Sequence, residues 1–253
     1  EAMYGFALRL SPEDLEAVAA QLYVEMLKSG FSVVGEFQYL HHAPDGTPYA
    51  DPAEMSLRCF AAAQHAGIGI TILPTLYAFG GFGGQDPLPG QRRFLNHAER
   101  FLRIVGNLSI QARNHSLRHV GISPHSLRAV PVDLLPELVQ AGRDLLGDGF
   151  PMHIHISEQQ REVEECMTSC GASPIDSLAD TVELDAHWNL VHATHVTQSE
   201  LGRITSAGAR VVICPLTEAY LGDGIFPASD FVFRGGELAI GSDSNVRIDA
   251  VEE

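Results

Sequence analysis

The 253-residue chain is 45% hydrophobic, enough to bury a sizeable core in one large α/β barrel or in two smaller domains. Its 32 acidic residues outnumber its 16 lysines and arginines, and the net charge of −16 disfavours binding to nucleic acid or to an anionic membrane surface. A small anionic substrate can still bind, because a local arginine outweighs distant charges that salt screens beyond about 10 Å.

The four cysteines are too sparse and too irregular for a disulfide scaffold, and they favour a reducing, cytoplasmic location. Cys166 and Cys170 have the spacing of half a zinc site, but no second pair matches them. The uncharged stretch 66–85 suggests a membrane span by its length. Because it contains Pro74 and several glycines, it predicts a strand and a loop instead, and we expect a soluble protein.

The first predicted helix covers residues 11–30, with Ser11 as its N-cap, Pro12 in its first turn and Gly30 at its end. Further helices are predicted at residues 52–67, 90–108, 132–146, from 159 onward, and 197–208. The apolar stripe of the first helix is expected to consist of Leu15, Val18, Ala19, Leu22 and Met26. The acidic helix from Gln159 is expected to have a solvated face with Glu162, Glu164 and Glu165.

Short apolar runs between these helices predict buried strands at residues 31–40, 68–77, 119–126, 151–157, 188–194, 210–215 and 237–244. A (β/α)8 barrel contains eight strands in about 250 residues. Because the chain opens on a helix, we predict strands two to eight of such an α/β barrel, without strand one. The alternative is a doubly wound open sheet, although no glycine-rich phosphate loop follows the first predicted strand.

The strand at 151–157 carries His153 and His155 on the same face, because side chains alternate along a strand. Glu158 follows immediately after its end. A zinc ligand must be a neutral imidazole and a proton shuttle must be a carboxyl group, and this spacing offers both. The two histidines could equally be hydrogen-bonded in a polar core layer, and this strand alone does not decide between the two.

Other strand ends favour a site. His192 lies near the end of strand 188–194, Asp243 near the end of the last strand, and His125 with Arg128 follows an earlier strand. Since barrel enzymes keep their active sites at the carboxyl ends of the strands, we expect these ionisable groups to meet at one rim. His153 and His195 are expected to be structural.

The motifs "HIHISE", "LVHATH" and "IGSDS" together resemble the amidohydrolase superfamily, in its mononuclear deaminase branch. Within that branch, "HSLRAV" and "TEAYLGDGIFPASDF" resemble the formimidoylglutamate deiminases. The similarity extends over essentially the whole chain. It implies a metal-dependent hydrolase that converts N-formimidoyl-L-glutamate to N-formyl-L-glutamate and ammonia in histidine degradation.

The resemblance also implies roles for individual residues. His155 would bind the metal, and Asp243 would bind it and help to deprotonate a water molecule. Glu158 would carry the proton to the leaving nitrogen, and His192 would orient or polarise the reacting group. One divalent ion is implied, zinc or alternatively iron, since both accept imidazole and carboxylate ligands.

The glutamyl part of the substrate would be bound by His125, Arg128 and Tyr39. Arginine suits this role because its planar guanidinium matches a carboxylate in a bidentate geometry. A homodimer is a further implication of the resemblance. Two alternatives stay open: a related deaminase acting on a purine or another heterocycle, and an inactive barrel fragment.

One departure from the superfamily pattern concerns its first barrel strand, which normally supplies a His-x-His pair to the metal. Here His41 and His42 have the wrong spacing and follow the wrong strand. The small β-sandwich that usually flanks the barrel is also not found. We therefore expect residues 1–253 to be an amidohydrolase barrel domain truncated at both ends, with only two of its own metal ligands and weak or no metal binding.

Overall fold

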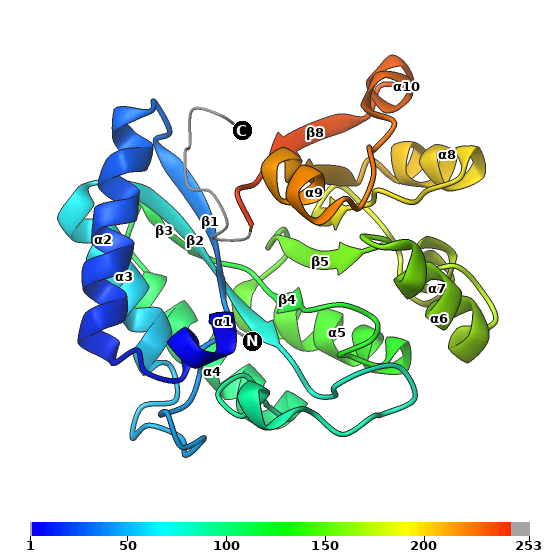
Figure 1. Cartoon of the computed structure of the whole chain (residues 1–253). Coiled ribbons are helices and arrows are strands. Elements are labelled where there is room, and N and C mark those ends of the chain that lie inside the picture. The colour runs from blue at the N-terminus through cyan, green and yellow to red at the C-terminus, as the bar shows by residue number, and fades with distance from the viewer. Residues whose placement is uncertain (1, 244–253) are drawn as a thin grey trace. The chain divides into compact units, whose positions relative to one another are not determined.

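The computed structural model describes residues 2–243, so the last residue of the predicted strand 237–244 lies outside the described part. Helices and parallel strands alternate along the chain (Figure 1). The strands are β1 (Val33–Gln38), β2 (Gly69–Leu76), β3 (Arg118–Val120), β4 (Ser123–Pro124), β5 (Met152–Ile156), β6 (Trp188–His192), β7 (Arg210–Ile213) and β8 (Glu237–Ile240). The helices are α1 (Ala2–Ala7), α2 (Pro12–Lys28), α3 (Glu54–Ala66), α4 (Ala98–Ala112), α5 (Leu135–Leu146), α6 (Gln160–Cys170), α7 (Pro174–Thr181), α8 (Gln198–Ala207), α9 (Pro215–Leu221) and α10 (Ala228–Phe233).

The chain folds as two compact units, which are described separately. The first contains residues up to 81 together with 85–123 and 138–150. The second contains residues 82–84 and 124–137 and the described residues from 151 onward. In the described residues, no helix combines the length and the apolar character needed to cross a membrane.

The first unit is built on a sheet in the order β1-β2-β3, in which β4 also pairs with β2. β1, β2 and β3 are parallel. β2 is almost entirely buried, as expected for a parallel strand that is covered on both faces. Helices α2 and α3 pack against each other beside this sheet (Figure 1). The predicted strand 119–126 is divided into β3 and β4, which is why the described residues contain one strand more than predicted.

Helix α2 begins as the sequence predicts. The Ser11 hydroxyl accepts a hydrogen bond from the Asp14 backbone N–H at 3.0 Å, and the Asp14 carboxylate accepts one from the Ser11 N–H at 3.1 Å. The predicted apolar stripe is partly wrong, because Val18 is 54% exposed. The fully buried positions are Ala19 and Tyr23, and the Tyr23 hydroxyl donates to Glu36 on β1 at 2.9 Å.

The helix predicted at 90–108 is wrong in its first half. Residues Pro89–Gln91 form a single 3-10 turn, and α4 begins only at Ala98 and continues to Ala112. The reason is Arg93, whose side chain is fully buried. Its guanidinium donates to the backbone carbonyls of His42 (2.7 Å) and Leu10 (2.9 Å), so long-range contacts hold this segment in a loop.

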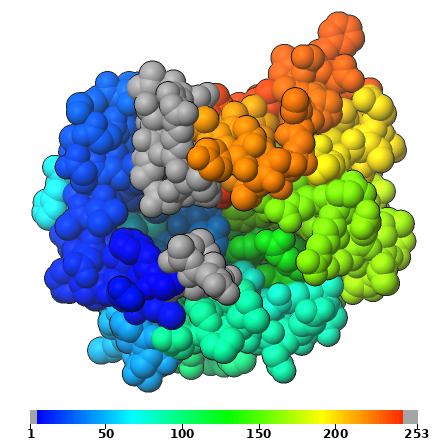
Figure 2. Space-filling model, viewed as in Figure 1, coloured from blue at the N-terminus to red at the C-terminus, as the bar shows by residue number. Residues whose placement is uncertain are grey.

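The second unit is built on a parallel sheet in the order β5-β6-β7-β8. Its β6 strand is buried at every position, including Trp188. Helix α8 has a capping box between Thr197 and Glu200. The sequence did not predict α7, α9 and α10 as separate helices. Helix α10 projects from the surface of this unit (Figure 2) and leaves Phe233 92% exposed.

Candidate active site

The second unit gathers ionisable side chains at the carboxyl ends of its parallel strands. His155 lies on β5, Glu158 lies two residues beyond that strand, and His192 is the last residue of β6. Asp243 lies three residues beyond β8. Because neighbouring strands run in the same direction, with Ile156 paired to His192, these ends meet at one edge of the sheet. The rim predicted from the sequence is therefore present within this unit.

The backbone at this edge adopts unusual conformations. Ser157, His192, Ala193 and Asp243 have φ angles of +52°, +70°, +49° and +48°, and Asn114 is the only other non-glycine described residue with positive φ. Such a conformation costs a non-glycine residue about 1–3 kcal/mol and persists only where its surroundings enforce it. Backbone hydrogen bonds contribute here, from Ala193 N–H to the Ile156 carbonyl at 3.0 Å and from His195 N–H to the Ser157 carbonyl at 2.9 Å. This concentration of strain is typical of a functional site.

The imidazole of His155 is held in one tautomer. Its Nδ1 atom lies 3.0 Å from the backbone carbonyl oxygen of His125. A carbonyl can only accept, so Nδ1 carries the proton and Nε2 of the neutral ring keeps a lone pair. Nε2 lies 3.8 Å from Oδ1 of Asp243, and the His155 side chain is only 8% exposed. A neutral, oriented imidazole facing a carboxylate is the arrangement that a divalent metal requires.

Asp243 is suited to stay ionised. Burial opposes its ionisation, but the hydrogen bond and electrostatic attraction of His155, with smaller contributions from His192 and Thr217, outweigh burial and lower the pKa of the carboxyl group. Its side chain is 24% exposed.

His192 differs from His155 in its partners. Its Nδ1 lies 3.2 Å from Oε1 of Glu218, and its Nε2 lies 4.0 Å from Oε1 of Glu158. Burial favours the neutral ring, but the hydrogen bond to Glu218 and the charges of Glu158 and Asp243 outweigh it and raise the pKa of His192.

The donor atoms of His155, His192 and Asp243 all lie within 4.8 Å of one another. Two imidazole nitrogens and a carboxylate oxygen are typical zinc ligands. With His155 oriented by the His125 carbonyl, the residues present fit a divalent ion. The cluster therefore brings together the two predicted ligands and His192. In the described part of the chain, neither Cys166 nor Cys170 belongs to a group of this kind.

A second group of donor atoms lies behind His192. His192, Cys214 and Glu218 have donor atoms within 4.8 Å of one another, and all three residues are buried. Cys214 follows β7, and Glu218 lies in the first turn of α9. Sequence reasoning did not select Glu218. The sequence feature that could have indicated Glu218 is its place in "CPLTE", directly after a predicted buried strand.

The structure corrects the prediction for one glutamate of α6, the helix that follows Glu158. Glu162 is only 4% exposed, so its assignment to a solvated face is wrong, whereas Glu164 is exposed as predicted and Glu165 is half-buried. Glu162 turns inward because its Oε2 accepts a hydrogen bond from the Glu158 N–H at 2.9 Å, at the start of α6. Burial raises the pKa of Glu162, while the charge of Arg128 opposes this effect. Glu162 thus fixes the backbone of the residue expected to move a proton.

The predicted substrate-binding residues are divided between the two units. The His125 ring lies 4.9 Å from the His155 ring, and its Nδ1 lies 2.8 Å from the Ser126 hydroxyl. Burial, followed by electrostatic repulsion from His155 and Arg128, lowers the pKa of His125 well below its ordinary value, so the ring is neutral. Arg128 is half-buried. Tyr39 belongs to the first unit, where its ring stacks against Phe37 at 6.3 Å, and its role in substrate binding stays a prediction.

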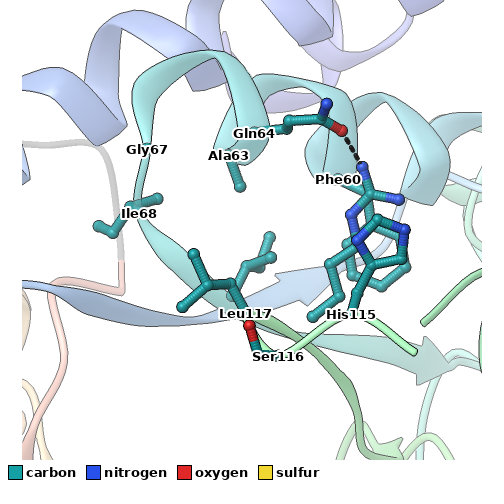
Figure 3. A pocket seen from close by; sticks show the side chains of 10 residues that line it. Phe60, Ala63, Gln64, Gly67, Ile68, His115, Ser116 and Leu117 are labelled. Carbon is teal, nitrogen blue, oxygen red and sulfur yellow. Dashed lines mark hydrogen bonds between the residues drawn. The ribbon is translucent and has the colours of Figure 1, made fainter. Parts of the chain in front are cut away.

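The first unit has a cavity of about 240 Å³ at the amino ends of β2 and β3 (Figure 3). Arg118 lies over the Phe60 ring, 5.3 Å from its centroid, and hydrogen-bonds Gln64. None of the predicted site residues lines this cavity. Barrel enzymes act at the opposite, carboxyl ends of their strands, so the cavity does not compete with the cluster around His155.

Known proteins share both the sequence pattern and the fold of this chain. The sequence pattern of the Amidohydrolase family matches residues 3–253. The chain belongs to the amidohydrolase family. A crystal structure of an amidohydrolase from Brucella melitensis is 48% identical and superimposes with a TM-score of 0.91, covering 98% of this chain and 54% of that protein. The predicted α/β barrel class is thereby confirmed over the open doubly wound sheet.

Among curated relatives of this amidohydrolase chain, the formimidoylglutamate deiminase of Pseudomonas aeruginosa is 50% identical over 255 residues, covering 100% of this chain and 55% of the relative. The 5-methylthioadenosine/S-adenosylhomocysteine deaminase of Natronomonas pharaonis is 27% identical, covering 100% and 53%. An adenosine deaminase from Xanthomonas campestris with bound zinc is 23% identical and shares the fold, with a TM-score of 0.74 over 94% of this chain and 48% of that protein. The chain spans about half the length of the curated relatives it matches.

Proposed function

We propose that the protein containing this chain is a metal-dependent hydrolase that converts N-formimidoyl-L-glutamate and water to N-formyl-L-glutamate and ammonia. The observation that carries the proposal is the convergence of His155, His192 and Asp243 within 4.8 Å of one another. The choice of substrate is supported by 50% identity to a formimidoylglutamate deiminase along the whole chain.

His155 and Asp243 would hold the ion. When bound, a divalent ion such as zinc lowers the pKa of water towards about 7 and so provides hydroxide for attack on the C=N carbon. Asp243 would accept the proton of the attacking water, because its low pKa keeps the carboxylate ionised at neutral pH.

Glu158 would deliver a proton to the leaving nitrogen. Its carboxylate lies 4.0 Å from Nε2 of His192, and its side chain is 13% exposed, so solvent does not surround the group. Proton transfer by a positioned carboxyl group typically contributes about 10²–10⁴-fold to the rate. His192 would orient or polarise the reacting amidine through its Nε2 atom.

Arg128 and the neutral His125 would bind a carboxylate of the substrate. The chain carries a net charge of −16, which repels a dicarboxylate substrate. The guanidinium of Arg128 would offset this repulsion locally by pairing with a substrate carboxylate. Tyr39 is proposed as a further contact. Zinc is the proposed ion, with iron as the alternative, and its presence in the Xanthomonas campestris adenosine deaminase supports zinc.

We further propose that residues 1–253 form part of an amidohydrolase barrel domain, with strands two to eight, in a cytoplasmic homodimer. A second candidate function is deamination of a purine nucleoside, supported by the 27% identity to a 5-methylthioadenosine/S-adenosylhomocysteine deaminase.

The test is ammonia release by the zinc-loaded, full-length protein. We expect turnover of N-formimidoyl-L-glutamate and none of 5-methylthioadenosine or of N-formimidoylglycine, which lacks the side-chain carboxylate. Equal turnover of the glycine compound would contradict the dicarboxylate assignment, and preferential turnover of the nucleoside would favour the second candidate.

A further inference from the structure

Helix α9 lies behind two residues of the candidate site and contacts both of their segments. Its Glu218 places Oε1 3.2 Å from Nδ1 of His192. The preceding residue, Thr217, donates its hydroxyl to the carbonyl of Ser242 at 3.2 Å, directly before Asp243 in the chain. One helical turn after β7 therefore supports the ends of both β6 and β8. The proposed chemistry assigns no role to either α9 residue.

The hydrogen bonds of Glu218 define which nitrogen of His192 carries a proton. Oε1 of Glu218 accepts the backbone N–H of Cys214 at 2.8 Å. The same oxygen faces Nδ1 of His192, so Nδ1 is the donor in that contact. With Nδ1 directed to α9, the other nitrogen of the ring, Nε2, faces Glu158 at 4.0 Å.

The anchoring of Glu218 is rigid. Its side chain is 7% exposed, and its backbone carbonyl accepts the Asp223 N–H at 3.0 Å in the turn that ends α9. A buried carboxylate without partners is strongly unfavourable, whereas one that accepts two N–H groups is stabilised and fixed in place. His192 is 1% exposed and itself adopts a strained backbone with φ of +70°, so its ring needs a fixed partner to keep its direction.

We propose that Glu218 is a positioning residue, which fixes the ring orientation and the Nδ1–H tautomer of His192 so that Nε2 points to the reacting group. This inference rests on the proposed function, because that function places His192 at the reacting centre. The partner of His155 makes the contrast clear: a neutral carbonyl orients that ring, whereas a carboxylate orients His192.

The test compares Glu218→Gln, Glu218→Leu and the control Glu164→Gln, an exposed glutamate on α6. Glu218→Gln keeps an oxygen that can accept both N–H groups, and Glu218→Leu removes the acceptor. In the zinc-loaded full-length protein we expect a fall in kcat of about 10-fold for the first and about 100-fold for the second, as for partners that orient active-site histidines. KM and zinc content should not change, because Glu218 hydrogen-bonds His192 rather than either predicted metal ligand, and Glu164→Gln should match the wild type.

A second readout does not depend on turnover. Long-range ¹⁵N–¹H correlation spectra of the histidine rings report the tautomer, and the His192 signals are assigned by their loss in His192→Asn. We expect an Nδ1–H ring in the wild type and in Glu218→Gln, and a shift towards Nε2–H in Glu218→Leu. If Glu218→Leu fails to fold, the kcat of Glu218→Gln still tests the proposal, and an unchanged value overturns it.

The two proposals fail in different ways. If the wild type is inactive but Glu218→Leu shifts the His192 tautomer, the proposed reaction is contradicted and the positioning role is supported. An unchanged tautomer in Glu218→Leu overturns the positioning role, even in an active enzyme. The last check replaces zinc by cobalt(II) in the full-length protein. A thiolate-to-cobalt charge-transfer band that disappears in Cys214→Ser would show that Cys214 binds the metal together with Nδ1 of His192. This result would also overturn the proposal.

Discussion

The Nδ1 atom of His155 lies 3.0 Å from the backbone oxygen of His125. The same oxygen accepts the His155 backbone N–H at 2.9 Å, so one carbonyl fixes both the strand and the ring. Backbone, unlike a side chain, cannot be removed by substitution at position 125. The orientation of the predicted metal ligand is therefore independent of the side chain expected to touch substrate.

Removing a predicted ligand should remove the metal. We expect His155→Ala and Asp243→Ala to lower the zinc content of the full-length protein from about one per chain to less than about 0.1, since loss of a direct ligand costs more than the 10–100-fold typical of supporting residues. Elemental analysis after dialysis measures this. His187→Ala, at a half-exposed surface histidine, is the control. Retention of zinc in both ligand variants would show that the cluster is not the metal site.

Arg128→Met should weaken substrate binding without changing the metal content. Loss of a hydrogen-bonded charge costs about 1.5–3 kcal/mol, so KM should rise about 10–100-fold. Steady-state kinetics on N-formimidoyl-L-glutamate, with zinc analysis alongside, measure both quantities. Arg103→Met is the control, because the Arg103 side chain is 63% exposed on α4. An unchanged KM would disprove carboxylate binding by Arg128.

Stability should fall as the pH rises, because of Glu36 on β1. Burial raises the pKa of this carboxyl group from 4.5 to about 7, so the folded state binds more protons than the unfolded state between these values. The resulting stabilisation is fully present below pH 4.5 and is lost as the pH rises through about 7, with an upper bound of about 3 kcal/mol. Urea unfolding from pH 5 to pH 8 measures the decline, which Glu36→Gln should flatten.

The capping box of α2 should contribute to stability by itself. Ser11→Ala removes the acceptor for the Asp14 N–H and should lower the free energy of unfolding by about 1 kcal/mol. Ser11→Asp restores an acceptor and should return most of this amount, which makes it the matched variant. Chemical denaturation of both proteins measures the difference. Equal destabilisation by the two substitutions would show that the cap is not the cause.

The sequence predicted the features that depend on local pattern. The N-cap of α2, the parallel strands, and His155, His192 and Asp243 at strand ends all follow from short-range periodicity and from the rule that parallel strands end at one edge. The errors arise where distant contacts decide. Arg93 holds a loop where helical residues predict a helix, because its partners lie more than 50 residues away. No local pattern reveals such contacts.

Glu162 and Glu218 illustrate the same limit at the site. Both lie in the first turn of a helix, where acidic residues are common for electrostatic reasons and usually face solvent. Here each turns inward to a specific N–H group, from Glu158 and from His192 with Cys214 respectively. The position of the preceding strand decides which first-turn carboxylates face inward. The amino-acid sequence of the helix alone does not reveal that position.

The left-handed backbone at Ser157, His192, Ala193 and Asp243 opposes heat resistance to the proposed function. Glycine adopts that geometry without steric cost, so selection for heat resistance should enrich glycine at Ser157 and Ala193, the two positions of the four whose side chains have no assigned role. The same substitution at Ala193 would let the end of β6 adopt other conformations, and His192 would lose the orientation that the proposed reaction needs.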